Sequence, residues 1–392
     1  MDDLLRFGKK VAMRICLYPF RIFPIKKNRV VLMNNLAKTY ADNPKCVAEY
    51  LTENYKDKFE IIFPVNNLEK HAFLEEKGIK PVRFNSLKYF YYTMTAKIYL
   101  TNSGGFSYVP LRKKQYVINT WHGGGAYNKC GLDMYVDTKI FRYDLEMSAK
   151  YTNAFLSTCH KFTEVISKSM LVPKEVFWQI GMPRNDIMLK GNEEIRNKVR
   201  KEIGLTDDKR LILFAPTYRK PNDNYFKESV AISYGVDTER VCAAMEKRFG
   251  GKWVFAFRYH PAVTNRESFE QGKNVLDLTD YPDMQELLCA SDAMINDFSS
   301  SMWDFMLSGK PSFLFAIDLE HYIKTTEVYT PVDSWPFPKS VNNDQLEKNI
   351  LEFNEDDYKA ACKRHYDELG GTESGEATKL VCERIYNECF KK

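Results

Sequence analysis

Short apolar segments alternate with longer mixed segments along most of the chain. The apolar segments have the composition of buried strands, and the mixed ones repeat at helical spacing. In the first half they predict strands at 30–33, 59–65, 82–84, 97–101, 115–120, 155–157 and 176–180, and helices at 44–55, 68–77 and 87–95. Strands that alternate with helices predict a mostly parallel sheet with helices on both faces.

A charged and helical segment without a strong apolar stripe, 185–209, follows this half and is interpreted as the crossing between the domains. The alternation then restarts, with strands predicted at 210–215, 253–258, 275–276, 293–296 and 311–316, and helices at 236–248 and 283–290. A chain of 392 residues is long enough for two cores. We therefore predict two α/β domains, 29–205 and 206–392, the second ending in helices. They face each other across a cleft, with ligands at the carboxyl ends of the strands.

Basic and apolar residues occur together in the N-terminal segment, 1–28. Leu4, Phe7, Val11 and Ile15 fall at helical spacing and form one apolar stripe flanked by Arg and Lys. This pattern is typical of an amphipathic helix in the interface of an anionic membrane, where each basic residue adds about 1 kcal/mol. The alternative is a basic helix packed on the protein's own body. The sequence has no run of roughly 18 apolar residues, which a membrane-spanning helix needs.

Charge and cysteine content exclude several classes of protein. Residues 1–30 hold eight Arg and Lys against two Asp, which accounts for the whole net charge of +5 and leaves the remainder almost neutral. A nucleic-acid-binding body is therefore not expected. The nine cysteines are odd in number and never spaced C-x-x-C, which argues against a disulfide framework and a zinc site and favours a reducing cytosol.

A serine-rich turn at 291–305 is the first candidate binding site. The predicted strand at 293–296 turns into a helix that begins at Ser299, Ser300 and Ser301. The first N–H groups of a helix are unpaired and attract anions, so a phosphate suits this end. Asp304 lies one turn after Ser300 on the same face, where it could accept a hydrogen bond from a ribose hydroxyl. The alternative is an ordinary capped helix.

A histidine followed by three glycines ends another predicted strand, in the run Trp121-His122-Gly123-Gly124-Gly125. Glycines allow a backbone to approach a ligand or to adopt positive φ. A histidine at this edge can act as a general base near neutral pH. The alternative is a glycine-rich loop with a hydrogen-bonded histidine.

Three further strand ends carry polar residues. Arg258 and His260 end one strand in the second half, where they could stabilise phosphate charge, and Thr217 and Arg219 follow another. The run 181–186, Gly-Met-Pro-Arg-Asn-Asp, is interpreted mainly as a helix start. The chain contains no Walker sequence, G-x-G-x-x-G, H-E-x-x-H or G-x-S-x-G, which excludes the common nucleotide hydrolases, dehydrogenases, zincins and serine hydrolases. The absence of D-x-D weighs against a metal-chelating nucleotide-sugar transferase.

Taken in order, these motifs resemble those of the CDP-glycerol glycerophosphotransferase family of teichoic acid and capsule synthesis. The resemblance covers about residues 100–325 and rests on Trp121-His122-Gly123, 181–186, 214–219, His260-Pro261, 281–305, Lys310-Pro311 and Asp318-Leu319. It implies two Rossmann-like domains of the glycosyltransferase B type and a monotopic enzyme at the cytoplasmic face of the cell membrane. Such an enzyme transfers an alditol phosphate from CDP-glycerol or CDP-ribitol to a hydroxyl of a lipid-linked saccharide or polymer, releases CMP, and needs no metal or other cofactor.

The resemblance also assigns roles to residues. It implies His122 as the base candidate and His260 as a second catalytic histidine near the pyrophosphate. The donor-binding residues that follow from it are Thr217, Arg219, Arg258, Ser299, Ser300, Ser301 and Asp304. Those that border the acceptor are Trp121, Gly123, Gly124 and Gly125.

One departure from the family pattern concerns the acceptor loop. Many members have His-Gly-Thr-Pro-Leu-Lys, whereas this chain has His-Gly-Gly-Gly-Ala-Tyr-Asn-Lys, two residues longer. The acceptor therefore stays open, and the absence of an extra N-terminal domain favours a primase-like or short-polymer role. The alternatives are a nucleotide-sugar glycosyltransferase of the same fold and a non-catalytic, membrane-bound polymer-binding protein. The sequence leaves open whether the chain forms a homo-oligomer.

Overall fold

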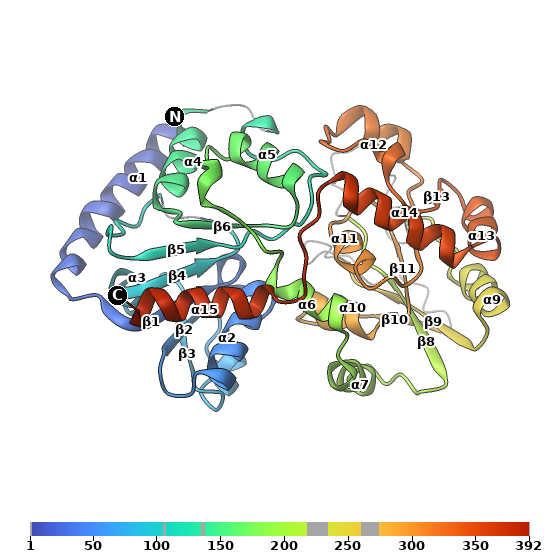
Figure 1. Ribbon diagram of the computed structural model, residues 1–392, viewed down its shortest axis with the longest axis horizontal. Helices are drawn as coiled ribbons and strands as arrows, with labels where there is room; N and C mark the ends of the chain where they lie inside the picture. Colours follow the sequence, from blue (N-terminus) through green and yellow to red (C-terminus); the bar gives the residue numbers. More distant parts are fainter. Residues whose placement is uncertain (1, 105–106, 135–137, 218–233, 260–273, 392) are drawn as a thin grey trace. The chain divides into compact units, whose positions relative to one another are not determined.

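The structure is a computed structural model that describes residues 2–104, 107–134, 138–217, 234–259 and 274–391. These form two compact units, one made of Met1–Asp186 with Leu369–Lys392 and the other of Ile187–Glu368. Each unit contains one parallel sheet with helices on its faces (Figure 1). The expectation of two parallel α/β halves is confirmed.

Unit 1 holds a sheet whose described strands run in the order β3-β2-β1-β4-β5-β6-β7, all parallel. The strands are β1 (Lys26–Met33), β2 (Glu60–Val65), β3 (Ile79–Arg83), β4 (Ala96–Thr101), β5 (Tyr116–Asn119), β6 (Ala154–Ser157) and β7 (Phe177–Gln179). The α-helices are α1 (Asp2–Leu17), α2 (Asp42–Asn54), α3 (Leu87–Thr95), α4 (Lys139–Tyr151), α5 (His160–Ser169) and α15 (Ala377–Phe390).

The apolar run of β1 explains why this sheet is covered on both faces. Val30 and Leu32 belong to one buried cluster, while Val31 and Met33 belong to another. Side chains alternate between the two faces of a strand, so an uninterrupted apolar run requires a core on each side. Helix α15 supplies Val381 to the first cluster, although it comes from the far end of the chain.

Unit 2 repeats the same winding, with the described strands in the order β10-β9-β8-β11-β12-β13, all parallel. They are β8 (Lys209–Phe214), β9 (Lys252–Phe257), β10 (Val275–Asp277), β11 (Ala293–Asn296), β12 (Ser312–Phe315) and β13 (Lys339–Ser340). The helices are α6 (Asp186–Lys190, beginning at the last residue of unit 1), α7 (Glu193–Glu202), α9 (Thr238–Phe249), α10 (Met284–Ala290), α11 (Ser301–Met306), α12 (Leu319–Thr325), α13 (Asn343–Leu351) and α14 (Glu355–Glu368). The winding reverses between β1 and β4 in unit 1 and between β8 and β11 in unit 2, where ligands of such sheets bind.

The division into units differs from the predicted boundary after residue 205. Helix α7 belongs to unit 2, since it packs against α10 and its Arg196 donates to Asp292 at 2.6 Å. The end of the chain belongs to unit 1, because α15 packs against α2 and buries an apolar face there. Charge and helical spacing within a segment do not reveal which unit its helix joins.

Three other local differences are small. The helix predicted at 68–77 is a 3₁₀ segment, Glu69–Leu74. Helices α4, α5 and α12 lie in stretches for which no helix is predicted. The short edge strand β13 is also absent from the prediction, since its two residues carry no period.

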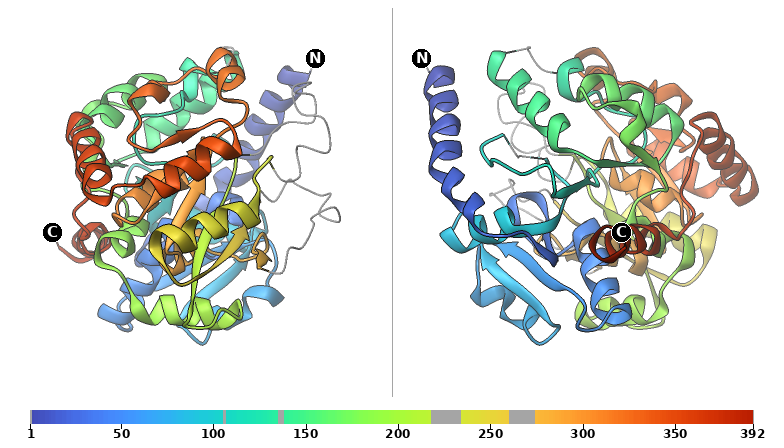
Figure 2. Two further views of the ribbon diagram at one scale, coloured as in Figure 1. Left: turned by 90° about the vertical axis from the view of Figure 1, so that its right-hand side faces the viewer. Right: turned by 60° about the vertical axis from the view of Figure 1, so that its left-hand side comes forward.

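Helix α1 and the 3₁₀ turn Tyr18–Ile22 lie at the edge of unit 1 (Figure 2). One side packs on the unit: Leu17 is buried, Arg14 donates to Tyr151 Oη at 2.8 Å, and Arg21 donates to the Leu111 carbonyl at 2.9 Å. The other side keeps Ile15 67% and Ile22 85% exposed. Packing on the protein's own body is thus confirmed for one face of the segment. Within the described chain no helix is long and apolar enough to cross a membrane.

Candidate active site

Two asparagines join the loops at the reversal of the unit 1 sheet. Asn34 follows β1 and Asn102 follows β4, and Asn102 Nδ2 donates to Asn34 Oδ1 at 2.6 Å. Asn102 Oδ1 accepts from the Asn35 amide at 2.8 Å. The Asn102 carbonyl then lies 2.7 Å from Nδ1 of His122, which follows β5. Neither asparagine was predicted, although each directly follows a predicted strand.

His122 is held in the form that a general base needs. A carbonyl oxygen only accepts, so Nδ1 carries the proton and Nε2 is the lone-pair atom of the neutral ring. The side chain is open to solvent, yet protein atoms surround much of the ring, and this desolvation lowers the pKa of His122. The Asn102 carbonyl and the Asp42 carboxylate act in the opposite direction, and Arg184 adds to the lowering. At neutral pH the ring is therefore mainly unprotonated.

The glycine loop beside His122 has one position that requires glycine. Gly125 has φ +72°, and a Cβ there would lie 2.1 Å from the Tyr127 ring. Its amide donates to Thr158 Oγ1 at 2.8 Å. A Cβ on Gly124 would lie 3.3 Å from Thr158, whereas one on Gly123 would meet nothing within 4 Å.

Gly125→Ala and Gly123→Ala form a matched pair that tests this loop. The first adds left-handed strain of about 1–2 kcal/mol and a clash, so we expect a melting temperature about 3–6 °C lower and at least about tenfold lower turnover. The melting temperature of Gly123→Ala should equal that of the unmodified protein, because the added methyl group has space. Calorimetric melting and nucleotide release measure the two effects. Equal behaviour of the two variants would contradict this account of the loop.

In unit 2, Thr217 and Asp297 join the loops at the reversal of the sheet. Thr217 follows β8, and its amide and hydroxyl each donate to Asp297 Oδ1 at 2.9 Å. Asp297 follows β11, is 2% exposed, and also accepts from the Ser299 amide at 3.2 Å. A buried carboxylate thus fixes the start of the serine turn relative to the end of β8.

The three serines do not cap α11 with their side chains. Ser301 is buried, and its Oγ accepts from Asn296 Nδ2 at 3.0 Å and lies 3.1 Å from Ser299 Oγ. Ser300 is exposed at the N-cap position and makes no side-chain capping bond. The capped-helix alternative is therefore wrong in its side-chain detail, and Ser300 keeps its hydroxyl at the surface.

Asp304 differs from Ser300 in its surroundings. It is 3% exposed, and its Oδ2 accepts from Gln285 Nε2 at 2.8 Å. Ser300 and Asp304, which are predicted to share one helix face, thus differ in exposure. The role of Asp304 in donor binding stays a prediction.

Arg258 brings a partly buried cation to the same edge of the sheet, directly after β9. Nη2 donates to the Tyr281 carbonyl at 3.1 Å, while the buried Nε has no hydrogen-bond acceptor among the described residues. Desolvation lowers the pKa of Arg258, opposed by Asp283, but a guanidinium stays charged at neutral pH. The predicted residues Arg219 and His260 lie outside the described residues, so their roles stay predictions.

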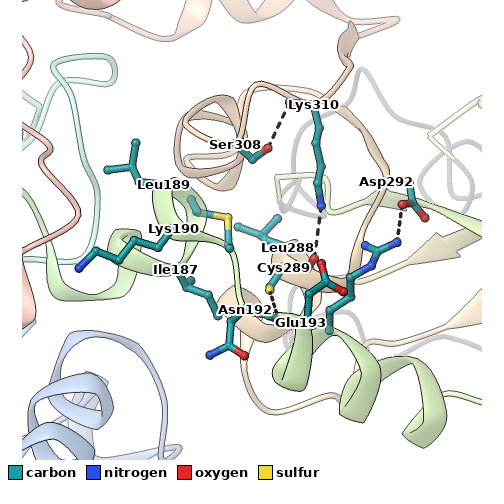
Figure 3. Close-up of a pocket in the computed structure, with 13 residues that line it drawn as sticks. Ile187, Leu189, Lys190, Asn192, Glu193, Leu288, Cys289, Asp292, Ser308 and Lys310 are labelled. Atoms are coloured by element: carbon teal, nitrogen blue, oxygen red, sulfur yellow. Dashed lines mark hydrogen bonds and ion pairs between the residues drawn. The ribbon is translucent and has the colours of Figure 1, made fainter.

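Unit 2 also contains a cavity of about 440 Å³ (Figure 3). Its lining includes Asp292, which precedes β11, and Lys310, which precedes β12, so it opens at the amino ends of the strands. Lys310 Nζ donates to the Ser291 carbonyl at 2.6 Å and so satisfies the end of α10. Burial lowers the pKa of this ammonium. The cavity is distinct from the predicted donor site, which belongs to the carboxyl ends.

The comparisons with known proteins agree with the motifs. The family model for CDP-Glycerol:Poly(glycerophosphate) glycerophosphotransferase matches residues 17–387. A teichoic acid poly(glycerol phosphate) polymerase of Bacillus spizizenii is 28% identical, over 82% of this chain and 82% of that protein. The polymerase of the same name from Staphylococcus epidermidis is 24% identical over 93% of this chain, which spans only 51% of its length.

The fold is shared with a solved structure, that of the wall teichoic acid polymerase TagF. It superposes with a TM-score of 0.81 at 23% identity and covers 99% of this chain and 97% of that one. The predicted glycosyltransferase B type of fold is thereby confirmed. Because the family model spans nearly the whole sequence, the chain belongs to the CDP-Glycerol:Poly(glycerophosphate) glycerophosphotransferase family.

Proposed function

We propose that this chain transfers glycerol phosphate from CDP-glycerol to a hydroxyl of a lipid-linked saccharide or polymer in teichoic acid synthesis, and releases CMP. The observation that carries the proposal is the state of His122, whose Nδ1 is fixed on the Asn102 carbonyl at 2.7 Å. Nε2 is thus available as a base at the carboxyl edge of the sheet, within a motif that matches the family. Membership of the family supports the donor class.

In the proposed reaction His122 Nε2 takes the proton of the acceptor hydroxyl. The acceptor oxygen attacks the β-phosphorus of CDP-glycerol and forms a new P–O bond. The bond between that phosphorus and the bridging oxygen breaks, and CMP leaves with the electron pair. Positioning and electrostatic stabilisation supply most of the catalysis in such transfers.

Unit 2 would bind the donor at the carboxyl edge of its sheet. The Ser300 hydroxyl is exposed there, and within the described residues the amides of Ser300 and Ser301 have no hydrogen-bond acceptor. The Arg258 guanidinium carries positive charge at the end of β9, which β8 separates from β11 in the same sheet. These groups suit a pyrophosphate, and we assign Arg219 and His260 to it as well, from the motif match.

A nucleotide-release assay tests the function. The purified protein is incubated with a short-chain lipid-linked acceptor and, in turn, CDP-glycerol, CDP-ribitol and UDP- or GDP-sugars. We expect CMP release with CDP-glycerol that requires the acceptor. Greater CMP release from CDP-ribitol would identify ribitol phosphate as the transferred group. Release of UDP or GDP would favour the nucleotide-sugar glycosyltransferase. The absence of nucleotide binding would favour the polymer-binding protein.

We further propose that the N-terminal segment binds the cytoplasmic face of the cell membrane peripherally. The exposed apolar residues Leu5, Ile15 and Ile22 lie on one segment that also carries Arg and Lys. Apolar insertion and attraction to anionic lipids act together in such segments. Of the basic residues, Arg14 and Arg21 serve instead to attach the segment to unit 1.

A triple substitution tests the membrane surface without removing the buried part of the segment. Each of Leu5→Ser, Ile15→Ser and Ile22→Ser loses about 1 kcal/mol of insertion energy, so we expect about 10²-fold weaker binding to anionic vesicles. The control is Ile323→Ser, which changes a 50% exposed isoleucine in unit 2 and should bind as before. Sedimentation with vesicles measures both. Undiminished binding of the triple variant would reject this surface.

A further inference from the structure

A buried arginine lies next to the histidine of unit 1 and has no part in the reaction described above. Arg184 is 5% exposed, and its Nη1 donates to the His122 carbonyl at 2.8 Å and to Asp42 Oδ2 at 3.1 Å. Burying a guanidinium is costly unless its charge is paired and hydrogen-bonded. Asp42 pairs the charge at Nη1, and the same nitrogen holds the His122 backbone.

Asn43 links Arg184 to Trp121, the residue before His122. Its Oδ1 accepts from the Arg184 amide at 3.0 Å, and its Nδ2 donates to the Trp121 carbonyl at 3.2 Å. The carbonyls of two consecutive residues, Trp121 and His122, are therefore held from one side by one arginine and one fully buried asparagine. Both come from elements that are distant in sequence.

The backbone that these contacts hold is strained. Trp121 has φ +54° and Asp42 has φ +64°, both in the left-handed region although neither is glycine. Such residues cost on the order of 1–3 kcal/mol each and persist only where the surrounding structure fixes them. The strained turn directs the His122 ring to the Asn102 carbonyl, which sets the tautomer.

We infer that Arg184, with Asp42 and Asn43, is a positioning residue for His122: it fixes the Trp121 and His122 backbone so that the imidazole stays on Asn102 with Nε2 available. This rests on the proposed role of His122 as base. We call Arg184, Asp42 and Asn43 the clamp. The run 181–186 therefore supplies one residue of the clamp, Arg184, as well as a helix start. The run is itself anchored, since the Met182 amide donates to Glu373 Oε2 at 3.1 Å.

The two charged members of the clamp act on the ring in opposite directions. Asp42 and Arg184 are the described charged groups that bear on His122, the first raising its pKa and the second lowering it. Removing Arg184 should therefore raise the pKa of His122, and neutralising Asp42 should lower it. Opposite shifts would show that both charges act at the ring, and the loss of kcat tests whether they also position it.

Arg184→Met and Asp42→Asn test the inference, with kcat, KM for CDP-glycerol and the pH profile of kcat/KM as readouts. We expect kcat at least about tenfold lower in both, since a positioned base contributes about 10²–10⁴-fold. KM should stay within about twofold, because the donor residues are in unit 2. The acid limb should move to higher pH in Arg184→Met and to lower pH in Asp42→Asn. Unmoved limbs with unchanged kcat would overturn the inference.

Titration of the His122 ring by NMR separates this inference from the proposed function. The resonance is assigned by its loss in His122→Gln, and its pKa is read in both variants without any turnover. Opposite shifts support the clamp even if no donor is consumed, in which case only the proposed function fails. Identical titration in both variants and the unmodified protein overturns the clamp. Should Arg184→Met not fold, Asp42→Asn decides alone, since Asp42 is partly exposed.

Discussion

His122→Gln lowers kcat by about 10²–10⁴-fold while CDP-glycerol still binds to unit 2 with unchanged affinity. Glutamine keeps a donor for the Asn102 carbonyl, yet it has no lone-pair nitrogen that can take a proton. Nucleotide release measures turnover, and isothermal calorimetry measures binding. Because desolvation lowers the pKa of His122, the ring gains its proton only at a pH below the usual titration range of histidine. In the unmodified protein kcat/KM should therefore fall only below that pH range.

His71→Gln is the matched control for this prediction. The Nδ1 of His71 also contacts a backbone carbonyl, that of Asn67, at 2.7 Å, but it lies on a 3₁₀ segment after β2, a strand that does not border the reversal of the sheet. Its turnover should equal that of the unmodified protein. A His122→Gln variant with normal turnover would remove this residue from the mechanism.

Asp297→Ala weakens the binding of CDP-glycerol by about 10²-fold. The buried carboxylate accepts from the Thr217 amide, the Thr217 hydroxyl and the Ser299 amide, and hydrogen bonds to charged groups contribute about 1.5–3 kcal/mol each. Without these three hydrogen bonds the serine turn is no longer held to the end of β8. A loss of about 3 kcal/mol of binding free energy corresponds to the expected change in affinity, which calorimetry measures.

A graded pair at Thr217 controls for general destabilisation. Thr217→Val removes the hydroxyl that bonds to Asp297 and should weaken donor binding about tenfold, whereas Thr217→Ser retains that bond and should change little. If Asp297→Ala and Thr217→Val both bind the donor normally, this edge of the sheet does not hold the nucleotide.

The elements that position the site could be predicted from the sequence because their signal is local. The apolar run of β1 and the polar residues after each strand place His122, Thr217 and Ser300 at carboxyl edges. The partners of these residues could not be predicted in the same way. Asn102 contacts His122 across 20 positions and Arg184 contacts it across 62, and spacing within one element does not show which loops meet.

The roles of the three serines could not be distinguished from the sequence. Their type and spacing predict an anion site and a capped helix equally well, since both use a hydroxyl at a helix start. Only tertiary contacts distinguish the roles. The Ser301 hydroxyl accepts a hydrogen bond from Asn296, whereas Ser300 is exposed. The N-terminal segment is similar, because sequence shows that arginine and apolar residues alternate but not that Arg14 faces inward.

The return of residues 369–392 to unit 1 has a consequence for synthesis of the chain. Unit 2 is contiguous and can fold as soon as residue 368 has left the ribosome. Unit 1 begins earlier, yet its core lacks Val381 and Ile385 until the last helix emerges. The half that carries His122 is therefore completed last, after the half that carries Thr217. Premature termination within residues 369–392 should leave a folded unit 2 attached to an open first core, a species prone to aggregation.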